Sequence, residues 1–185
     1  DDGRPVMHAG LMRHALEYAR PTGLPIICHE EDPALKGDGV MHEGFTATRL
    51  GLRGIPGAAE SVMCRRDTDL AELTGGRVHL AHLSASASFD ALRDAKRRGL
   101  AVTGETCPHY WVLTDESVGD YDTHSKMNPP LRSEADRDAC IARMDRALAE
   151  TKIEGVKTTI GFLRRLLRNP RFQRGKVTTG MLDEQ

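Results

Sequence analysis

The stretch Arg77-Val78-His79-Leu80-Ala81-His82-Leu83-Ser84 decides the fold of this chain, and a helical pattern follows it. An apolar run that ends in small polar residues predicts a buried β-strand. His79 and His82 are an odd number of positions apart, so the alternation of a strand predicts that their side chains point to opposite faces. His82 ends the strand, where α/β barrels place their chemistry, whereas His79 lies deeper and equally fits a hydrogen-bonded core histidine.

The segments on both sides of this strand alternate between strand and helix. Residues 24–29 predict a second buried strand, which three acidic residues follow, and residues 100–105 predict a third. Helices are predicted before and between the strands, over residues 7–20, 58–73 and 88–98. This alternation predicts a parallel sheet with functional residues at the strand ends, and the pattern alone leaves a barrel and a doubly wound sheet both open.

Two connecting segments carry signals of their own. Residues 37–57 are rich in glycine and predict a structured loop over the strand ends. Residues 126–132 predict an extended loop, because Asn128 precedes a proline and is pushed out of the helical region. Ser133 and Asp136 then predict a capping box at the start of the next helix.

The composition is that of an ordinary soluble protein. The chain has 185 residues, enough for one domain, of which 39% are hydrophobic and 29% charged. The net charge of −1 gives no electrostatic reason to expect a nucleic acid or an anionic membrane as a partner. No apolar run approaches the roughly 20 residues that span a bilayer, and four widely spaced cysteines predict a reducing cytoplasm. The chain starts on a polar turn without methionine, so we expect a segment of a longer protein.

Three side chains at predicted strand ends, Asp2, His29 and His82, form a candidate ligand set. One oxygen and two nitrogen ligands suit zinc or a similar divalent metal, and they leave positions open for water. Such a set is typical of a hydrolytic metal site, where the metal activates water and polarises a carbonyl group. Two plainer interpretations stay open, because Asp2 also fits a turn and His29 also fits a helix cap or a loop contact.

Several motifs occur in one order across residues 1–140. They are Asp1-Asp2-Gly3-Arg4-Pro5-Val6, His29-Glu30-Glu31-Asp32, His42-Glu43-Gly44, Gly54-Ile55-Pro56 with Ala59-Glu60, His79-Leu80-Ala81-His82-Leu83-Ser84 and Lys126-Met127-Asn128-Pro129-Pro130-Leu131-Arg132. In these motifs and their spacing, the segment resembles the dihydroorotase branch of the amidohydrolase superfamily. The resemblance implies an α/β fold that is part of a (β/α)8 TIM-type barrel.

The resemblance also implies an activity and a site. Dihydroorotases interconvert dihydroorotate and carbamoyl aspartate, two small molecules of pyrimidine biosynthesis, and they use two zinc ions. By resemblance, Asp2 would bridge the two ions, and His29 and His82 would bind the second one. Asn128 would contact the substrate. The related allantoinases and hydantoinases generally use a carbamylated lysine in the place of Asp2, so this position favours a dihydroorotase over that alternative.

Two motifs of the family do not occur in these 185 residues. One is a His-x-His pair that binds the other zinc ion and precedes a substrate-binding arginine. The other is an aspartate on the last strand, a ligand and proton shuttle, and the nearest candidate strand has Thr159 in its place. We therefore leave the catalytic residue unassigned and expect little or no activity from the isolated chain. The open edge of a partial barrel also predicts aggregation or pairing with another copy as a homo-oligomer.

The rest of the chain, residues 141–185, resembles the carboxyl-terminal end of biotin carboxylases. The resemblance includes Ile153-Glu154-Gly155-Val156-Lys157-Thr158 and Pro170-Arg171-Phe172, and it implies no biotin-dependent activity. We expect two domains, a partial amidohydrolase barrel over 1–140 and a short α/β tail over 141–185. The tail is predicted to supply no metal ligand and to contain a helix to about residue 150, a strand at 153–158 and a helix at 160–167. Both families place a helix at the junction, so a chimera could join there without disturbing the local structure. The chain is either such a chimera or a dihydroorotase with a diverged tail. The alternative to an enzyme is an inactive chimeric or structural remnant.

Overall fold

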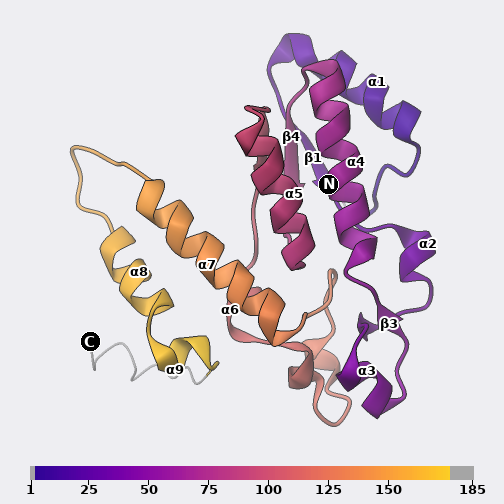
Figure 1. Cartoon of the computed structure of the whole chain (residues 1–185), viewed down its shortest axis with the longest axis vertical. Helices are drawn as coiled ribbons and strands as arrows, with labels where there is room; N and C mark the ends of the chain where they lie inside the picture. The colour runs from indigo at the N-terminus through magenta and orange to yellow at the C-terminus, as the bar shows by residue number, and fades with distance from the viewer. Residues whose placement is uncertain (1–2, 176–185) are drawn as a thin grey trace.

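A three-stranded parallel sheet forms the centre of the α/β part of the molecule (Figure 1). The computed structural model describes residues 3–175. The strands, in the order β1-β4-β5, are β1 (Ile26–His29), β4 (Val78–Ala81) and β5 (Val102–Gly104). His79 is the register partner of Ile27 on one side and of Thr103 on the other. The three strands predicted from the apolar runs are therefore confirmed, together with their parallel direction.

Helices cover one face of this sheet. They are α1 (Ala9–Ala19), with the 3-10 turn η1 (Arg20–Thr22) after it, α4 (Ala58–Thr74) and α5 (Ser86–Arg97). Val78, Leu80 and Val102 are at most 2% exposed, because alternate side chains of these strands point into the layer between sheet and helices. The other face is more open, and Ile27 there is 50% exposed. One covered and one open face are what a segment of a barrel wall presents.

The glycine-rich segment between β1 and α4 is a structured loop, as predicted. Its elements are α2 (Pro33–Lys36), β2 (Met41–His42), α3 (Phe45–Leu50) and β3 (Gly54–Ile55). β2 and β3 pair in parallel and form a second, two-stranded sheet. Glycine is required at position 54, because a Cβ atom there would lie 2.4 Å from the Cα atom of Glu43. The loop is therefore held by close backbone packing as well as by strand pairing.

A long connection follows β5 and returns to the core. Its elements are α6 (His109–Val112) and two 3-10 turns, η2 (Asp115–Val118) and η3 (Thr123–Ser125). The segment 126–132 comes next and contains neither helix nor strand, as predicted. Leu131 is only 1% exposed, and the Tyr110 hydroxyl donates a 2.6 Å hydrogen bond to the Pro129 carbonyl. Residues 129–132 are therefore buried in the fold, whereas Lys126 and Asn128 stay exposed.

The helix α7 (Glu134–Glu150) belongs to two hydrophobic cores. The Ser133 hydroxyl caps it by accepting the Asp136 backbone N–H at 3.3 Å, which is one half of the predicted capping box. The Asp136 carboxylate instead accepts from the Ser133 hydroxyl and from the Ser86 backbone N–H. Cys140 lies in the core shared with the sheet, whereas Ile141 lies in a second core. The partners of α7 in that second core are α6, α8 (Ile160–Leu167) and α9 (Pro170–Gln173). Figure 1 shows α8 and α9 beside α7, on the side away from α1.

The strand predicted at 153–158 is wrong. This segment is irregular and exposed, with exposed fractions of 52% for Ile153 and 67% for Val156. Gly155 has a φ of 84°, which interrupts the extended backbone, and no strand of residues 3–175 pairs with the segment. A strand needs a neighbour to satisfy its backbone groups. The described part of the tail is therefore helical and irregular.

The longest helices in the described part of the chain are α4 and α7, with 17 residues each. Both carry charged side chains at intervals, such as Arg65 in α4 and Arg146 in α7. Within residues 3–175, no helix has the length and apolar character that a membrane span requires.

Candidate metal and substrate site

His29 and His82 lie side by side at the carboxyl ends of β1 and β4. The His29 Nδ1 atom is 3.0 Å from the His82 Nε2 atom, and the ring centroids are 4.7 Å apart. His29 is the last residue of β1 and is 4% exposed, whereas His82 directly follows β4. The expected convergence of these two side chains is therefore observed. Asp2, the third predicted ligand, lies outside the described residues.

The backbone at His82 explains how this side chain reaches His29. β4 ends at Ala81, and His82 has a φ of 41°, in the left-handed region that few non-glycine residues adopt. The expectation that His79 and His82 face opposite sides is therefore wrong. By its register in the sheet, His79 faces the same side as His29, and its Nδ1 atom is 2.8 Å from the Thr103 hydroxyl. Strand alternation stops one residue before His82, which is why it does not predict the direction of that ring.

The two histidines have the geometry of two ligands of one metal ion. Zinc–nitrogen bonds of about 2.0–2.1 Å place two nitrogens of a tetrahedral site roughly 3.4 Å apart, close to the 3.0 Å found between His29 and His82. Burial lowers the pKa of His82, and the neighbouring His29 lowers it further. A lower pKa favours the neutral imidazole, which is the form that binds metal. The residues present therefore fit a divalent metal ion.

Asn128 lies against His29, so the structure brings together residues that were predicted for different roles. The Asn128 side-chain nitrogen is 3.4 Å from the His29 Nε2 atom and donates to the Glu31 carboxylate at 2.9 Å. Its side-chain oxygen accepts a 3.0 Å hydrogen bond from the Lys36 ammonium group. The segment 126–132 thus places an amide beside the histidine pair, within reach of a molecule bound there.

Glu31 and Lys36 were not among the predicted site residues. The Lys36 ammonium group donates to the Glu31 carboxylate at 2.7 Å. Burial by itself would raise the pKa of Glu31, but hydrogen bonds from His29, Lys36 and Asn128 outweigh it and lower that pKa to about 2. Glu31 is therefore ionised near neutral pH. One signal in the sequence could have identified this pair. Asp32 caps α2, and the single turn of this helix brings Lys36 back to Glu31.

A buried ion pair joins the segment 126–132 to α4. Arg132 and Glu60 are 3% and 1% exposed, and the Arg132 Nη2 atom is 3.5 Å from a Glu60 carboxylate oxygen. Arg132 also donates to the Ser84 hydroxyl at 3.0 Å. Glu60 accepts the backbone N–H groups of Ser84 and Ala85, each at 3.0 Å. This network fixes the backbone that follows His82, and it therefore helps to hold that ring at the site.

Two family models match different parts of the chain. The family described as dihydro-orotase-like matches residues 1–88. The family described as biotin carboxylase C-terminal domain matches residues 126–184. The two resemblances predicted from the motifs are therefore confirmed. The second match begins before residue 141, and the position of a junction between the two parts stays a prediction.

Curated relatives match the larger part of the chain. A dihydroorotase of Desulforapulum autotrophicum is 61% identical over 141 residues, which are 76% of this chain and 33% of that protein. A dihydroorotase of Anaeromyxobacter dehalogenans is 58% identical over 160 residues, which are 85% of this chain and 36% of that protein. The chain therefore spans about a third of the length of the curated relatives it matches.

Solved structures show which fold this is. A D-hydantoinase (dihydropyrimidinase) from Thermus sp. aligns with a TM-score of 0.64 and 22% identity, over 76% of this chain and 32% of that one. An L-hydantoinase (dihydropyrimidinase) from Arthrobacter aurescens aligns with a TM-score of 0.61 and 18% identity, over the same shares. At these identities the similarity concerns the fold alone. The α/β part of the chain therefore has the fold of part of these hydantoinases, in agreement with the predicted barrel segment.

Proposed function

We propose that this chain, the larger part of which is related to dihydroorotases, carries part of the metal and substrate site of a dihydroorotase. In the proposed reaction, the cyclic amide of dihydroorotate is hydrolysed to carbamoyl aspartate as a step of pyrimidine biosynthesis in the cytoplasm. The observation that carries the proposal is the 3.0 Å approach of the His29 and His82 ring nitrogens at the ends of two neighbouring parallel strands.

Two zinc ions are the proposed cofactor, with Asp2, His29 and His82 among their ligands. Zinc in such a site polarises a carbonyl group and activates water. His82 presents a neutral nitrogen, because burial and the nearby His29 ring disfavour its protonated form. Asn128 contacts the second nitrogen of His29, which restrains the orientation of that ring as partners of metal-binding histidines commonly do.

Asn128 is the proposed substrate contact. Its amide already donates to Glu31 and accepts from Lys36. A substrate that displaces one of these partners therefore meets both a donor and an acceptor on the same side chain. A cyclic amide offers the complementary N–H and C=O groups next to each other. This match supports a cyclic amide as the substrate class.

The open face of the sheet supports pairing with further strands. Ile27 is 50% exposed on the face that carries His29. Within the described residues, β1 and β5 each have one edge without a paired strand. Exposed strand edges readily pair with another chain, so we expect the isolated polypeptide to associate with a second copy.

A hybrid protein tests the proposed function. Residues 1–140 of this chain replace the segment they match in the dihydroorotase of Desulforapulum autotrophicum. The relative supplies the remaining strands, so the residues of this chain act in a complete barrel. The purified hybrid is assayed for hydrolysis of dihydroorotate and of hydantoin, and its zinc content is measured. We expect bound zinc and hydrolysis of dihydroorotate at a rate comparable with that of the unmodified relative.

Variants of the hybrid separate the proposed roles. His82→Ala should abolish turnover and lower the zinc content, because a metal ligand is lost. Asn128→Ala should lower kcat/KM while zinc stays bound. His79→Ala, in β4 just before His82, is the matched control and should leave both quantities unchanged. A folded hybrid that prefers hydantoin would identify a hydantoinase instead, and one that stays active without His82 would refute the assignment.

A further inference from the structure

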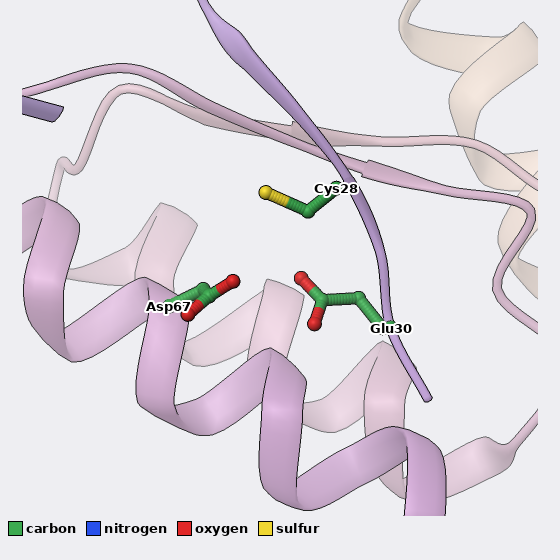
Figure 2. A group of neighbouring side chains, drawn as sticks. All are labelled: Cys28, Glu30 and Asp67. Atoms are coloured by element: carbon green, nitrogen blue, oxygen red, sulfur yellow. The ribbon is translucent and has the colours of Figure 1, made fainter. Parts of the chain in front are cut away.

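A second group of ligand-type side chains lies on the other side of β1. Cys28 and Glu30 flank His29 in the chain and point away from it, toward Asp67 on α4. Figure 2 shows the Cys28 sulfur and the Glu30 and Asp67 carboxyl groups turned toward one another. Each of the three residues offers a ligand atom, and these atoms all lie within 4.8 Å of one another. The fold thus gathers three potential ligands from a strand and a helix.

These side chains are buried, and several of their polar atoms are unsatisfied. The exposed fractions are 8% for Cys28 and 1% each for Glu30 and Asp67. Among the described residues, both Glu30 carboxyl oxygens and the Asp67 Oδ2 atom lack a hydrogen-bond partner. The Cys28 thiol makes a weak 3.9 Å hydrogen bond to the Ile26 carbonyl. Buried polar atoms in folded proteins nearly always have a partner. A proton shared between Glu30 and Asp67 would satisfy two of these three carboxyl oxygens, whereas a ligand bound among them would satisfy all three.

The charges around the group indicate that this ligand is a cation. The Arg66 Nε atom donates to the Asp67 Oδ1 atom at 2.6 Å, and Asp67 Oδ2 remains for the group. One arginine offsets one of the two carboxylates, and two carboxylates this close disfavour each other's ionised form. A divalent cation together with Arg66 balances the two carboxylates and a Cys28 thiolate. A buried site without net charge avoids the cost of an unpaired ion.

We propose that Cys28, Glu30 and Asp67 bind a divalent metal ion of the zinc class, separately from the His29 and His82 pair. Zinc accepts thiolate and carboxylate ligands, with bonds of about 2.3 Å to sulfur and 2.0–2.2 Å to oxygen, so its ligand atoms lie roughly 3.4–3.7 Å apart. The ligand atoms of the present group all lie within 4.8 Å of one another, so a bound ion would draw them closer together. Glu30 can also bind through both of its oxygens, which gives four donor atoms from three side chains. The ion would tie β1 to α4 and stabilise the fold.

Cobalt(II) is the probe for this site, because a thiolate ligand gives cobalt a near-ultraviolet charge-transfer band that histidine and carboxylate ligands do not. The whole chain is unfolded with a chelator present and then refolded with cobalt chloride, since buried ligands exchange metal slowly in the folded state. We expect the charge-transfer band and a urea unfolding midpoint above that of the metal-free chain. A chain with His29→Ala and His82→Ala should keep the band, which separates this site from the proposed active site.

Two serine variants locate the thiolate. Cys28→Ser should abolish the band. Cys140→Ser is the matched control and should keep the band, because Cys140 is also buried but contacts Thr106 instead of the proposed site. Glu30→Gln should weaken cobalt binding by roughly 100-fold or more, because loss of even an outer partner costs about 10- to 100-fold. Asp67→Asn gives an independent second test, and circular dichroism verifies refolding of each variant. Absence of the band in the refolded wild-type chain, or its persistence in Cys28→Ser, would overturn the proposal.

Discussion

Replacing Glu60 with glutamine tests whether the buried ion pair with Arg132 holds the site segments together. Glutamine keeps the shape of the side chain, and its carbonyl oxygen can still accept the backbone N–H groups of Ser84 and Ala85. The substitution removes the negative charge and turns an amide NH2 toward the Arg132 guanidinium. Arg132 is 3% exposed, so it becomes a buried cation that has lost the carboxylate it pairs with.

The size of the effect follows from this burial. Removing one partner of a buried ion pair costs about 3–5 kcal/mol in the free energy of unfolding. The separation of 3.5 Å between Arg132 Nη2 and the Glu60 oxygen is long, so we expect the lower end, about 3 kcal/mol. Domains are stable by only about 5–15 kcal/mol, which makes this a large loss. With a denaturant slope of about 2 kcal/mol per molar urea, the unfolding midpoint falls by roughly 1.5 M.

Equilibrium unfolding in urea, followed by circular dichroism, measures the loss. Glu72→Gln is the matched control, because Glu72 pairs with Arg98 at 2.8 Å but its side chain is 50% exposed, and such pairs contribute less than about 1 kcal/mol. The double variant Glu60→Gln with Arg132→Met removes the unpaired cation and should be more stable than Glu60→Gln alone. The reasoning would be refuted if Glu60→Gln lost no more stability than Glu72→Gln, or if the double variant were the less stable of the two.

Three further outcomes are expected. Ser133→Ala should lower the free energy of unfolding in urea by about 1 kcal/mol, because α7 loses its cap; an unchanged midpoint would contradict this. Burial, and then Arg132, lower the pKa of His42 below its ordinary 6.5. The His42 ring therefore takes up a proton less readily in the folded chain than in the unfolded chain. As a result, the stability of the folded chain falls as the pH drops below 6.5. His42→Gln should reduce this fall, and urea titrations that give the same pH profile for both proteins would rule it out. The 185-residue chain alone should hydrolyse dihydroorotate no faster than its His82→Ala variant. The reason is that the family's His-x-His pair and its proton-shuttling aspartate do not occur in these residues. Turnover that His82→Ala abolishes would show that a complete site assembles.

Patterns within single segments predicted most of the fold. Short, largely apolar runs between turn residues made β1, β4 and β5 recognisable, and glycine and proline bounded the helices around them. The strand predicted at 153–158 failed for a physical reason. A strand is completed by its neighbour, and a pattern within one segment does not report whether a neighbour exists.

The candidate site was predicted only in part. His29 and His82 were recognisable because strand ends are visible in the sequence and barrels use them. The direction of the His82 ring depends on one left-handed backbone angle, which a histidine rarely adopts and no pattern signals. Glu31 and Lys36 were missed because they are fixed by contacts with Asn128, which lies 97 and 92 positions away in the chain.

The alternation along β1 has a consequence for how this segment can change during evolution. His29 and Glu31 serve one side of the strand, and Cys28 and Glu30 serve the other. Substitutions on one side leave the other in place, so the two groups can be gained or lost independently. Insertion or deletion of one residue just before Cys28 would turn the side chains that follow it to the opposite side and exchange the two groups. A change of residue type on one side of the strand therefore affects one group, whereas a change in the length of the strand affects both.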